Sequence, residues 1–377
     1  MQTSRYWRLS FADRPAGDPA DECERIREGL LEATRIRLRS DVPVGALLSG
    51  GIDSSAVVAA MCRSGADGLR TFSIGFDADG YDETPHARAV AEMYGTEHHE
   101  RRLEPGDAEE LLPRIVRHHG EPFADESSIA TFRLAELARR HVTVALNGDG
   151  GDESFAGYPR YRHAMGRLPH WAPAKIQARR YGPHVARLTG SERDGLYTPG
   201  FRETLGRDRW LEPLERLLRD SAAPSALERM LDVDVQSYLP GDLLPKMDTA
   251  TMAHSLEARS PFLDHMLMEA TAALPADAKL GGGRSKALLK DAVADWLPPG
   301  LTERPKQGFS VPLDDWFRGP LRRLPEDILL DPATVERGIF QPARIRRMLA
   351  EHRLRAADHG AALWTLMVLE TWQRELT

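Results

Sequence analysis

Apolar and polar positions divide the chain into a first part where helical and strand patterns alternate and a second part where helical patterns dominate. In the first part, apolar residues recur at helical spacing over 21–38, 53–62, 84–94, 107–119 and 129–140. Shorter runs with strand character cover 42–48, 71–76, 98–103 and 142–146. Strands that alternate with helices are typical of a parallel sheet covered on both faces. The sequence therefore predicts an α/β fold.

Strand signals fade after Pro159, where helical patterns separated by Pro and Gly follow one another. These predicted helices cover 226–239, 265–274, 285–296 and 343–352, and the apolar run 361–369 predicts a buried terminal helix. The change near residues 160–170 is the best candidate boundary. We therefore divide the chain into a linker-like segment over 1–20, an α/β region over 21–165 and a mostly helical region over 166–377.

Composition narrows the class of protein. The 377 residues are 41% hydrophobic and 28% charged, which suffices for a large core and excludes wholesale disorder. The net charge of −7 makes nucleic acid an unsuitable main partner. The only cysteines, Cys23 and Cys62, provide neither a disulfide framework nor a cysteine zinc site, and indicate a reducing compartment. Residues 1–11 lack a signal-peptide pattern and no apolar run reaches membrane length, so we expect a cytoplasmic protein without a membrane partner.

The sharpest chemical signal is the segment 47–55, Leu-Leu-Ser-Gly-Gly-Ile-Asp-Ser-Ser, in which a predicted strand enters a glycine-rich turn before a helix. In a parallel sheet such a turn lies at the carboxyl edge, where ligands bind. Glycines allow close backbone approach, and free N–H groups at a helix start attract an anion. The candidate binding residues are Ser49, Gly50, Gly51, Asp53, Ser54 and Ser55, with Asp53 as a Mg²⁺ ligand. A helix cap alone would need only one Ser or Asp.

A second cluster over 146–153, Leu-Asn-Gly-Asp-Gly-Gly-Asp-Glu, follows another buried strand and should lie at the same edge of the sheet. Three acids within five residues repel one another unless a cation or an amine lies among them. The spacing does not match a calcium-binding EF-hand loop. Asp152 is the best second Mg²⁺ ligand, and Asp149 is the best base or ammonia-binding carboxylate.

The other candidates carry weaker signals. The pairs His98–His99 and His118–His119 are interpreted as structural or surface residues, because neighbouring residues point apart and no further ligands recur at useful spacing. Only six of the 50 basic residues are lysines, so each retained lysine is a candidate for a compact ammonium. By itself, Lys306 in the Pro/Gly-rich loop 297–312 would be interpreted as a solvated surface residue.

The segment 49–54 matches the Ser-Gly-Gly-x-Asp-Ser signature of the ATP pyrophosphatase, or PP-loop, enzymes, and it is not a Walker A sequence. Together with 147–158, 239–264 and 304–312, it resembles the synthetase domain of glutamine-hydrolysing asparagine synthetases. The resemblance runs in order from about Tyr6 to the C-terminus. It implies a PP-loop fold of the HUP-like, Rossmann-like type.

The resemblance also implies roles for individual residues, carried over position by position. Pyrophosphate and Mg²⁺ would be held by Ser49, Gly51, Asp53, Ser54 and Asp152. Leu47 and Ile74 would flank the adenosine, and Gly148 would lie against the nucleotide. Lys286 and Lys306 would be active-site lysines. Asn147 belongs to the same nucleotide-binding segment. A loop that carries Lys306 could bring an ammonium to the phosphates and then to the tetrahedral intermediate.

The implied activity is that of a carbon–nitrogen ligase that uses ATP and Mg²⁺. ATP would adenylate a substrate carboxylate, aspartate or a related acid, with release of pyrophosphate, and ammonia or an amine would then displace AMP. Within enzymes, the alternatives are a tailoring amide ligase, a macrolactam or β-lactam-type cyclase, or a sugar-acid amidotransferase. A non-catalytic ATP-binding partner of a separate glutaminase is an alternative of a different class.

The sequence departs from the family pattern at several positions. Gln2 occupies the place of the nucleophilic cysteine of the family's N-terminal glutaminase domain, so we expect no glutamine hydrolysis by this chain. Asp149 stands where many members have Glu, and Asn147 where they have Ser. Ser-Ser-Ile-Ala over 127–130 replaces a Thr- and Arg-containing segment associated with aspartate. A separate glutaminase chain and a homodimer are left open as partners.

Overall fold

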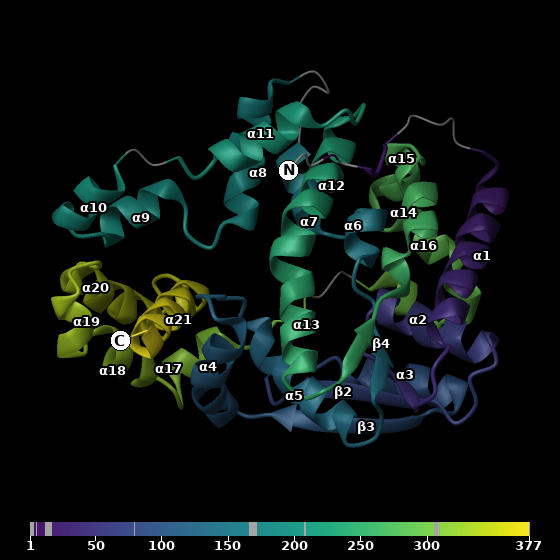
Figure 1. Cartoon of the computed structure of the whole chain (residues 1–377), viewed down its shortest axis with the longest axis horizontal. Coiled ribbons are helices and arrows are strands. Elements are labelled where there is room, and N and C mark those ends of the chain that lie inside the picture. The colour runs from purple at the N-terminus through teal and green to yellow at the C-terminus, as the bar shows by residue number, and fades with distance from the viewer. Residues whose placement is uncertain are drawn as a thin grey trace.

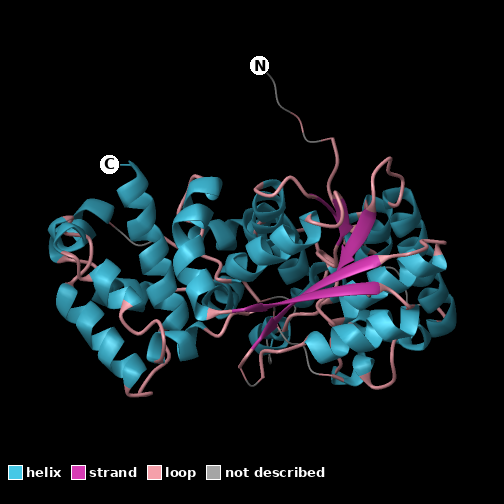
Figure 2. Ribbon diagram, turned by 90° about the horizontal axis from the view of Figure 1, so that it is seen from below, coloured by secondary structure: helices cyan, strands magenta, loops and turns pink. Residues whose placement is uncertain are grey.

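A five-stranded parallel sheet forms the centre of the first half of the chain, in a computed structural model that describes residues 4, 6–11, 17–78, 80–165, 172–206, 209–304, 308 and 310–376. The strands are β1 (Val44–Leu47), β2 (Arg70–Phe76), β3 (Glu97–Leu103), β4 (Val144–Leu146) and β5 (Glu257–Arg259). They pair in the order β3-β2-β1-β4-β5 and lie side by side in Figure 2. The predicted α/β fold is confirmed.

Helices cover both faces of this sheet, because alternate strand residues point to opposite sides. Leu47, Phe72 and Ile74 pack in one hydrophobic cluster with α4 (Pro105–His119), α5 (Ser127–Arg139) and α21 (Gly360–Leu376). Ala46 and Leu48 pack in a second cluster with residues of α1, α2, α3 and α16. Those helices are α1 (Pro19–Arg37), α2 (Ile52–Arg63), α3 (Thr84–Tyr94) and α16 (Ala287–Ala292), and Figure 1 shows them together on one side of the molecule.

The second half of the chain is mostly helical, as predicted. Its helices not yet named are α6 (Gly151–Phe155), α7 (Pro159–Met165), α8 (Ala174–Val185), α9 (Gly190–Leu196), α10 (Pro199–Leu205), α11 (Glu212–Asp220), α12 (Ala226–Gln236), α13 (Leu244–Met252), α14 (His265–Ala272), α15 (Ala276–Lys279), α17 (Leu313–Arg318), α18 (Leu324–Leu329), α19 (Pro332–Glu336) and α20 (Pro342–Arg353). A π-helical turn, Leu239–Leu243, joins α12 to α13. Such turns are frequent at functional sites.

The sequence analysis missed β5. Its three residues, Glu257, Ala258 and Arg259, lie in the helical half, yet they pair with β4 and complete the sheet. The strand has no apolar run because it lies at the edge of the sheet, where charged side chains are tolerated and reduce association with other chains. The two halves therefore share one sheet, and the carboxyl edge of that sheet is built from both.

The N-terminal segment also packs into the fold. Leu9 and Phe11 are buried and belong to a hydrophobic cluster with Tyr161, Tyr181 and residues of α12. In the part of the chain that the structure describes, no helix combines the length and the apolar character that a membrane span requires.

Candidate active site at the carboxyl edge of the sheet

A cavity of about 440 Å³ opens at the carboxyl edge of the sheet, with walls from both halves of the chain. Its wall includes the following residues predicted from the sequence: Leu47, Ser49, Gly50, Gly51, Asp53, Ser54, Ile74, Asn147, Gly148, Asp149, Asp152 and Lys286. Ser55 is the exception, because its side chain is wholly buried and is not part of the wall. Lys306 lies outside the described residues, although Gly308 and Ser310 of its loop line the cavity.

The first glycine-rich loop is held in shape by its own serines. The Ser49 hydroxyl accepts the Gly51 N–H at 3.2 Å and lies 3.0 Å from the Ser54 hydroxyl, which donates to the Gly51 carbonyl at 3.2 Å. Gly50 has φ +81°, and a Cβ there would lie 2.7 Å from the backbone nitrogen of Ala87. Only glycine fits this turn without strain. The loop therefore presents the start of α2 to the cavity in a form suited to an anion.

The second loop touches the first directly. A Cβ at Gly148 would lie 2.8 Å from both the Asp53 Cβ and the Ser54 backbone nitrogen, and a Cβ at Gly151 would lie 2.6 Å from the Asp53 Cγ. The Asn147 Oδ1 accepts the Asp149 N–H at 3.2 Å and the Ser260 hydroxyl at 2.5 Å. Two accepted hydrogen bonds fix the orientation of this amide, so its NH₂ group has no partner among the described residues. It is available to donate to a ligand.

Lys286 lies between the two predicted Mg²⁺ ligands. Its Nζ is 2.6 Å from the Asp152 Oδ1 and also contacts the Asp53 Oδ2. All three side chains are largely buried, with exposed fractions of 4% for Lys286, 14% for Asp53 and 11% for Asp152. The ammonium balances one of the two carboxylates and leaves one negative charge. Two carboxylates that contact one ammonium, beside a loop suited to an anion, match the oxygen donors and the ligand number that Mg²⁺ takes from protein in nucleotide sites.

Glu153, next in sequence to Asp152, is buried and holds its proton. Burial, and then the neighbouring Asp152 charge, raise the pKa of Glu153 to about 8. The Tyr158 hydroxyl donates to its Oε1 at 2.7 Å. The Arg160 guanidinium lies 3.9 Å from the centre of the Tyr158 ring and bonds to the buried Asp234 at 2.8 Å. This chain of contacts fixes the wall of the cavity beside Asp152.

We expect Glu153→Gln to stabilise the protein more at pH 8 than at pH 5. The pKa of Glu153 is about 8 in the fold and about 4.3 in an unfolded chain, so the wild type loses stability as pH rises between these values. The neutral Gln removes that loss, which amounts to at most ~1.4 kcal/mol per pH unit. Denaturant unfolding at both pH values measures it, with Glu109→Gln on the exposed face of α4 as the control. An equal effect of Glu153→Gln at both pH values would contradict the assignment.

The far wall of the cavity contains an ionic group that the sequence analysis did not identify. Lys246 is 8% exposed, and its ammonium donates to the Asp125 Oδ2 at 2.9 Å and to the Ser127 hydroxyl at 2.8 Å. Burial alone would raise the pKa of Asp125, but Lys246 and then Arg187 hold it at about 2. Arg187 also pairs with Glu126 at 2.7 Å. The available signals were the rarity of lysine and the position of Lys246 in the segment 239–264.

A further acid, Asp242, lies beside this far wall without lining the cavity. Burial, and then the charge of Asp125, raise the pKa of Asp242 to about 6. Asp149 also lines the cavity, and its charge adds to that of Asp125 in raising the pKa of Lys246 against the effect of burial. Tyr238 and Met247 complete this end. The cavity therefore has an anion-binding end at the glycine-rich loop and a mixed, acid-rich end around Lys246.

Comparison with known proteins agrees with this arrangement. The family model described as asparagine synthase matches residues 25–374, which is nearly the whole chain. The chain belongs to the asparagine synthase family. The predicted resemblance is thus confirmed, and the match includes both glycine-rich loops, β5 and the far wall of the cavity.

Individual relatives in this family are moderately similar. The chain is 29% identical over 97% of its length to asparagine synthetase [glutamine-hydrolyzing] 1 of Bacillus subtilis, and 33% identical over 98% of its length to a putative asparagine synthetase [glutamine-hydrolyzing] of Mycobacterium tuberculosis. It spans 61% and 60% of the lengths of those relatives. It is also 28% identical, over 84% of its length, to the amidase chyE of Penicillium rubens, of which 57% is covered.

Proposed function

We propose that this chain is an ATP-dependent amide synthetase that forms AMP and pyrophosphate. The observation that carries the proposal is the meeting of two glycine-rich loops and Lys286 around Asp53 and Asp152 at one end of a cavity. An anion-binding loop with a carboxylate pair and an ammonium suits the triphosphate of ATP. Membership of the asparagine synthase family supports the same chemistry.

In this proposal the phosphates are bound by the backbone N–H groups and hydroxyls of 49–54 and by the Lys286 ammonium, and Leu47 and Ile74 flank the adenosine. Asp53 and Asp152 would hold Mg²⁺, which, when bound, neutralises charge on the departing pyrophosphate. The carboxylate oxygen of the substrate attacks the α-phosphorus, and the α–β phosphate bond breaks. Since positioning and charge neutralisation supply most of the acceleration in transfer at phosphorus, the protein needs no covalent intermediate.

Amide formation follows at the acyl carbon of the adenylate. The nitrogen lone pair of ammonia or an amine forms the new C–N bond, AMP leaves, and the proton of the nitrogen passes to a base. Asp149 is the proposed base, because it lines the same cavity as the glycine-rich loop and Lys246. Lys306, which lies outside the described residues, remains the proposed donor to the oxyanion of the tetrahedral intermediate.

The far wall is the proposed position of the acyl substrate. It includes Asp125, Ser127 and Lys246, and the segment 127–130 differs from the one associated with aspartate in the family. Aspartate or a related acid is the proposed substrate class. Asp125 and Asp149 in the cavity wall, with Asp242 beside it, favour a carboxylic acid that also carries an amino group, since neighbouring acids favour a cationic partner.

We propose free ammonia or a substrate amine, and not glutamine, as the nitrogen donor for this chain. Cys23 and Cys62 lie on α1 and α2, and burial raises the pKa of both thiols. A raised pKa disfavours the thiolate that a glutaminase needs as nucleophile.

The deciding experiment screens a panel of carboxylic acids for pyrophosphate release with ATP, Mg²⁺ and ammonium, and identifies the amide by mass spectrometry. We expect at least one amino-bearing acid to give equal amounts of AMP, pyrophosphate and amide, with glutamine unable to replace ammonium. ATP binding without any acid-dependent pyrophosphate exchange would instead support a non-catalytic ATP-binding protein. Release of ADP and phosphate would contradict the proposed attack at the α-phosphorus.

A further inference from the structure

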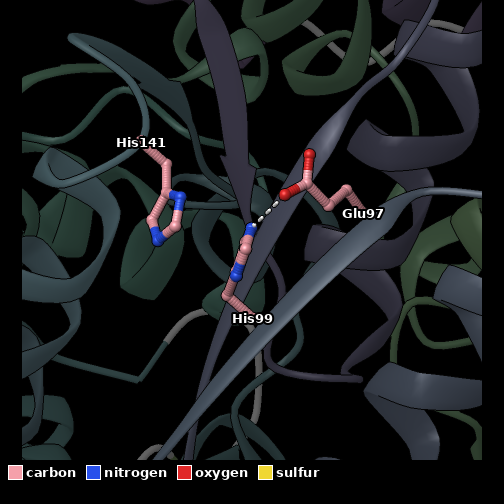
Figure 3. Close-up of side chains that lie close together, drawn as sticks. All are labelled: Glu97, His99 and His141. Atoms are coloured by element: carbon pink, nitrogen blue, oxygen red, sulfur yellow. Dashed lines mark ion pairs between the residues drawn. The ribbon is translucent and has the colours of Figure 1, made fainter.

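Three side chains with metal-binding atoms converge at the amino edge of the sheet, opposite the cavity. Glu97 and His99 come from β3, and His141 comes from the turn that enters β4 (Figure 3). Their candidate ligand atoms all lie within 4.8 Å of one another. The sequence alone offered only the pair His98–His99, whose side chains point to opposite faces of the strand. The fold supplies the additional ligands from the same strand and from a segment 42 residues further along the chain.

The side chains of the cluster contact one another. The His99 Nε2 lies 3.1 Å from the Glu97 carboxylate, and the His99 and His141 rings stack with centroids 3.8 Å apart. The His99 Nε2 is buried, and the Glu97 Oε1 is the atom that it faces. Imidazole nitrogens are the commonest protein ligands for transition metals.

Arg70 and Phe72 of β2 support the cluster from outside. The Arg70 Nε donates to the Glu97 Oε2 at 2.9 Å, which leaves the Oε1 facing His99, and its Nη1 donates to the His141 carbonyl at 3.0 Å. The Phe72 ring lies 5.4 Å from the His99 ring and 5.7 Å from the His141 ring. Hydrogen bonds to a ligating carboxylate and an apolar backing are the outer contacts that orient metal ligands.

A second group with similar spacing, Asp314, His352 and Asp358, lacks these properties. The His352 Nδ1 accepts the His359 N–H at 3.0 Å, and its Nε2 lies 3.1 Å from the Asp314 carbonyl. Asp358 contacts Arg318. Both ring nitrogens of His352 are thus engaged with the protein, so spacing alone does not make a site.

We propose that Glu97, His99 and His141 bind one divalent transition-metal ion of the Zn²⁺ type, with water as a further ligand. Two imidazoles and one carboxylate are an established zinc ligand set. The rings stack at an interplanar angle of 26°, so their lone pairs run nearly parallel, and one ring must turn for both to meet the ion. His141 lies in a turn outside the strands and is the ring that turns. The ion would join the edge strand β3 to the segment that leads into β4.

The test is a Zn²⁺ titration of the metal-freed protein by calorimetry, with Co²⁺ absorption as the spectroscopic readout. We expect one ion per chain and a Zn²⁺-dependent rise in the midpoint of thermal unfolding. His141→Ala and Glu97→Gln should each weaken binding about tenfold or more, because even outer-shell changes cost ~10- to 100-fold. His98→Ala is the matched control, since this ring lies on the same strand but bonds to Thr71 at 2.8 Å.

The remaining comparison separates this site from the carboxylates in the cavity. Asp152→Asn should leave the Zn²⁺ affinity unchanged, because Asp152 lies at the opposite edge of the sheet. Circular dichroism verifies that each variant is folded, and Glu97→Gln preserves the shape of the cluster if His141→Ala does not fold. Wild-type affinity in both His141→Ala and Glu97→Gln, or the absence of a stoichiometric site in the wild type, would overturn the proposal.

Discussion

Asp53→Asn and Asp152→Asn are each expected to lower ATP-dependent pyrophosphate release by about 1,000-fold, while the protein stays folded. Each substitution removes one of the two carboxylates that contact the Lys286 ammonium and would hold Mg²⁺. A metal ion contributes several kcal/mol of charge stabilisation in such reactions, and each ~1.4 kcal/mol corresponds to a tenfold change in rate. A pyrophosphate assay at saturating ATP and Mg²⁺, with the acid identified by the panel, measures the loss.

The matched control is Asp291→Asn. Asp291 lies on α16, five residues after Lys286, but its side chain is 49% exposed and pairs with Arg284. Surface ion pairs contribute little, so activity should stay close to that of the wild type. If both Asp53→Asn and Asp152→Asn kept most of the activity, the assignment of this carboxylate pair to Mg²⁺ and pyrophosphate would be wrong.

Gly157→Ala is expected to lower the same activity by about 100-fold, although it adds only a single methyl group. A Cβ at this position would lie 1.8 Å from the Asp152 Oδ1 and 2.1 Å from the Lys286 Cε. The φ of Gly157 is not in the left-handed region, so the effect comes from contact and not from backbone strain. The methyl group must separate Lys286 from Asp152, and misplacement of a catalytic group by ~1 Å can cost ~100-fold.

Gly195→Ala on α9 is the control for this substitution, because a Cβ there meets no atom within 4 Å. Its activity and thermal midpoint should equal those of the wild type or improve slightly, since Ala is favoured over Gly in a helix. Wild-type activity in Gly157→Ala would show that the contact between Lys286 and Asp152 is not needed for the reaction. Thermal unfolding of both variants separates loss of activity from loss of fold.

The α/β part of the fold was predictable because buried helices and strands show a recognisable pattern of apolar residues in the sequence. The helix expected over 84–94 is α3 with the same bounds, and the strand expected over 71–76 is β2, which begins at Arg70. In α3 the buried residues recur at helical spacing, and in β2 every residue after Arg70 is buried, as in a strand covered on both faces. β5 shows no apolar pattern in its sequence, because it is short, contains charged residues and is paired on one side only. Its pairing with β4 depends on the chain having already folded.

The candidate site was predictable only in part, for the same reason. The two glycine-rich loops could be placed at one edge because both follow buried strands of a parallel sheet. The far wall could not, since Lys246 and Asp125 are 121 residues apart and neither belongs to a glycine-rich loop after a buried strand. Ser55 was assigned to the loop by its position in the motif, but it is wholly buried. Lys306 remains a prediction from the family resemblance.

The sequence by itself therefore determined the parallel α/β architecture and the family. It also determined the two loops suited to an anion and a cation. These features depend on local apolar patterns, on glycine positions and on the order of strands along the chain. Only the tertiary structure decided which charges meet. Lys286 reaches Asp53 across 233 residues, and His141 joins Glu97 and His99 from a different segment. Such contacts arise from the packing of helices and turns against the sheet, and a linear pattern does not encode the distances that this packing produces.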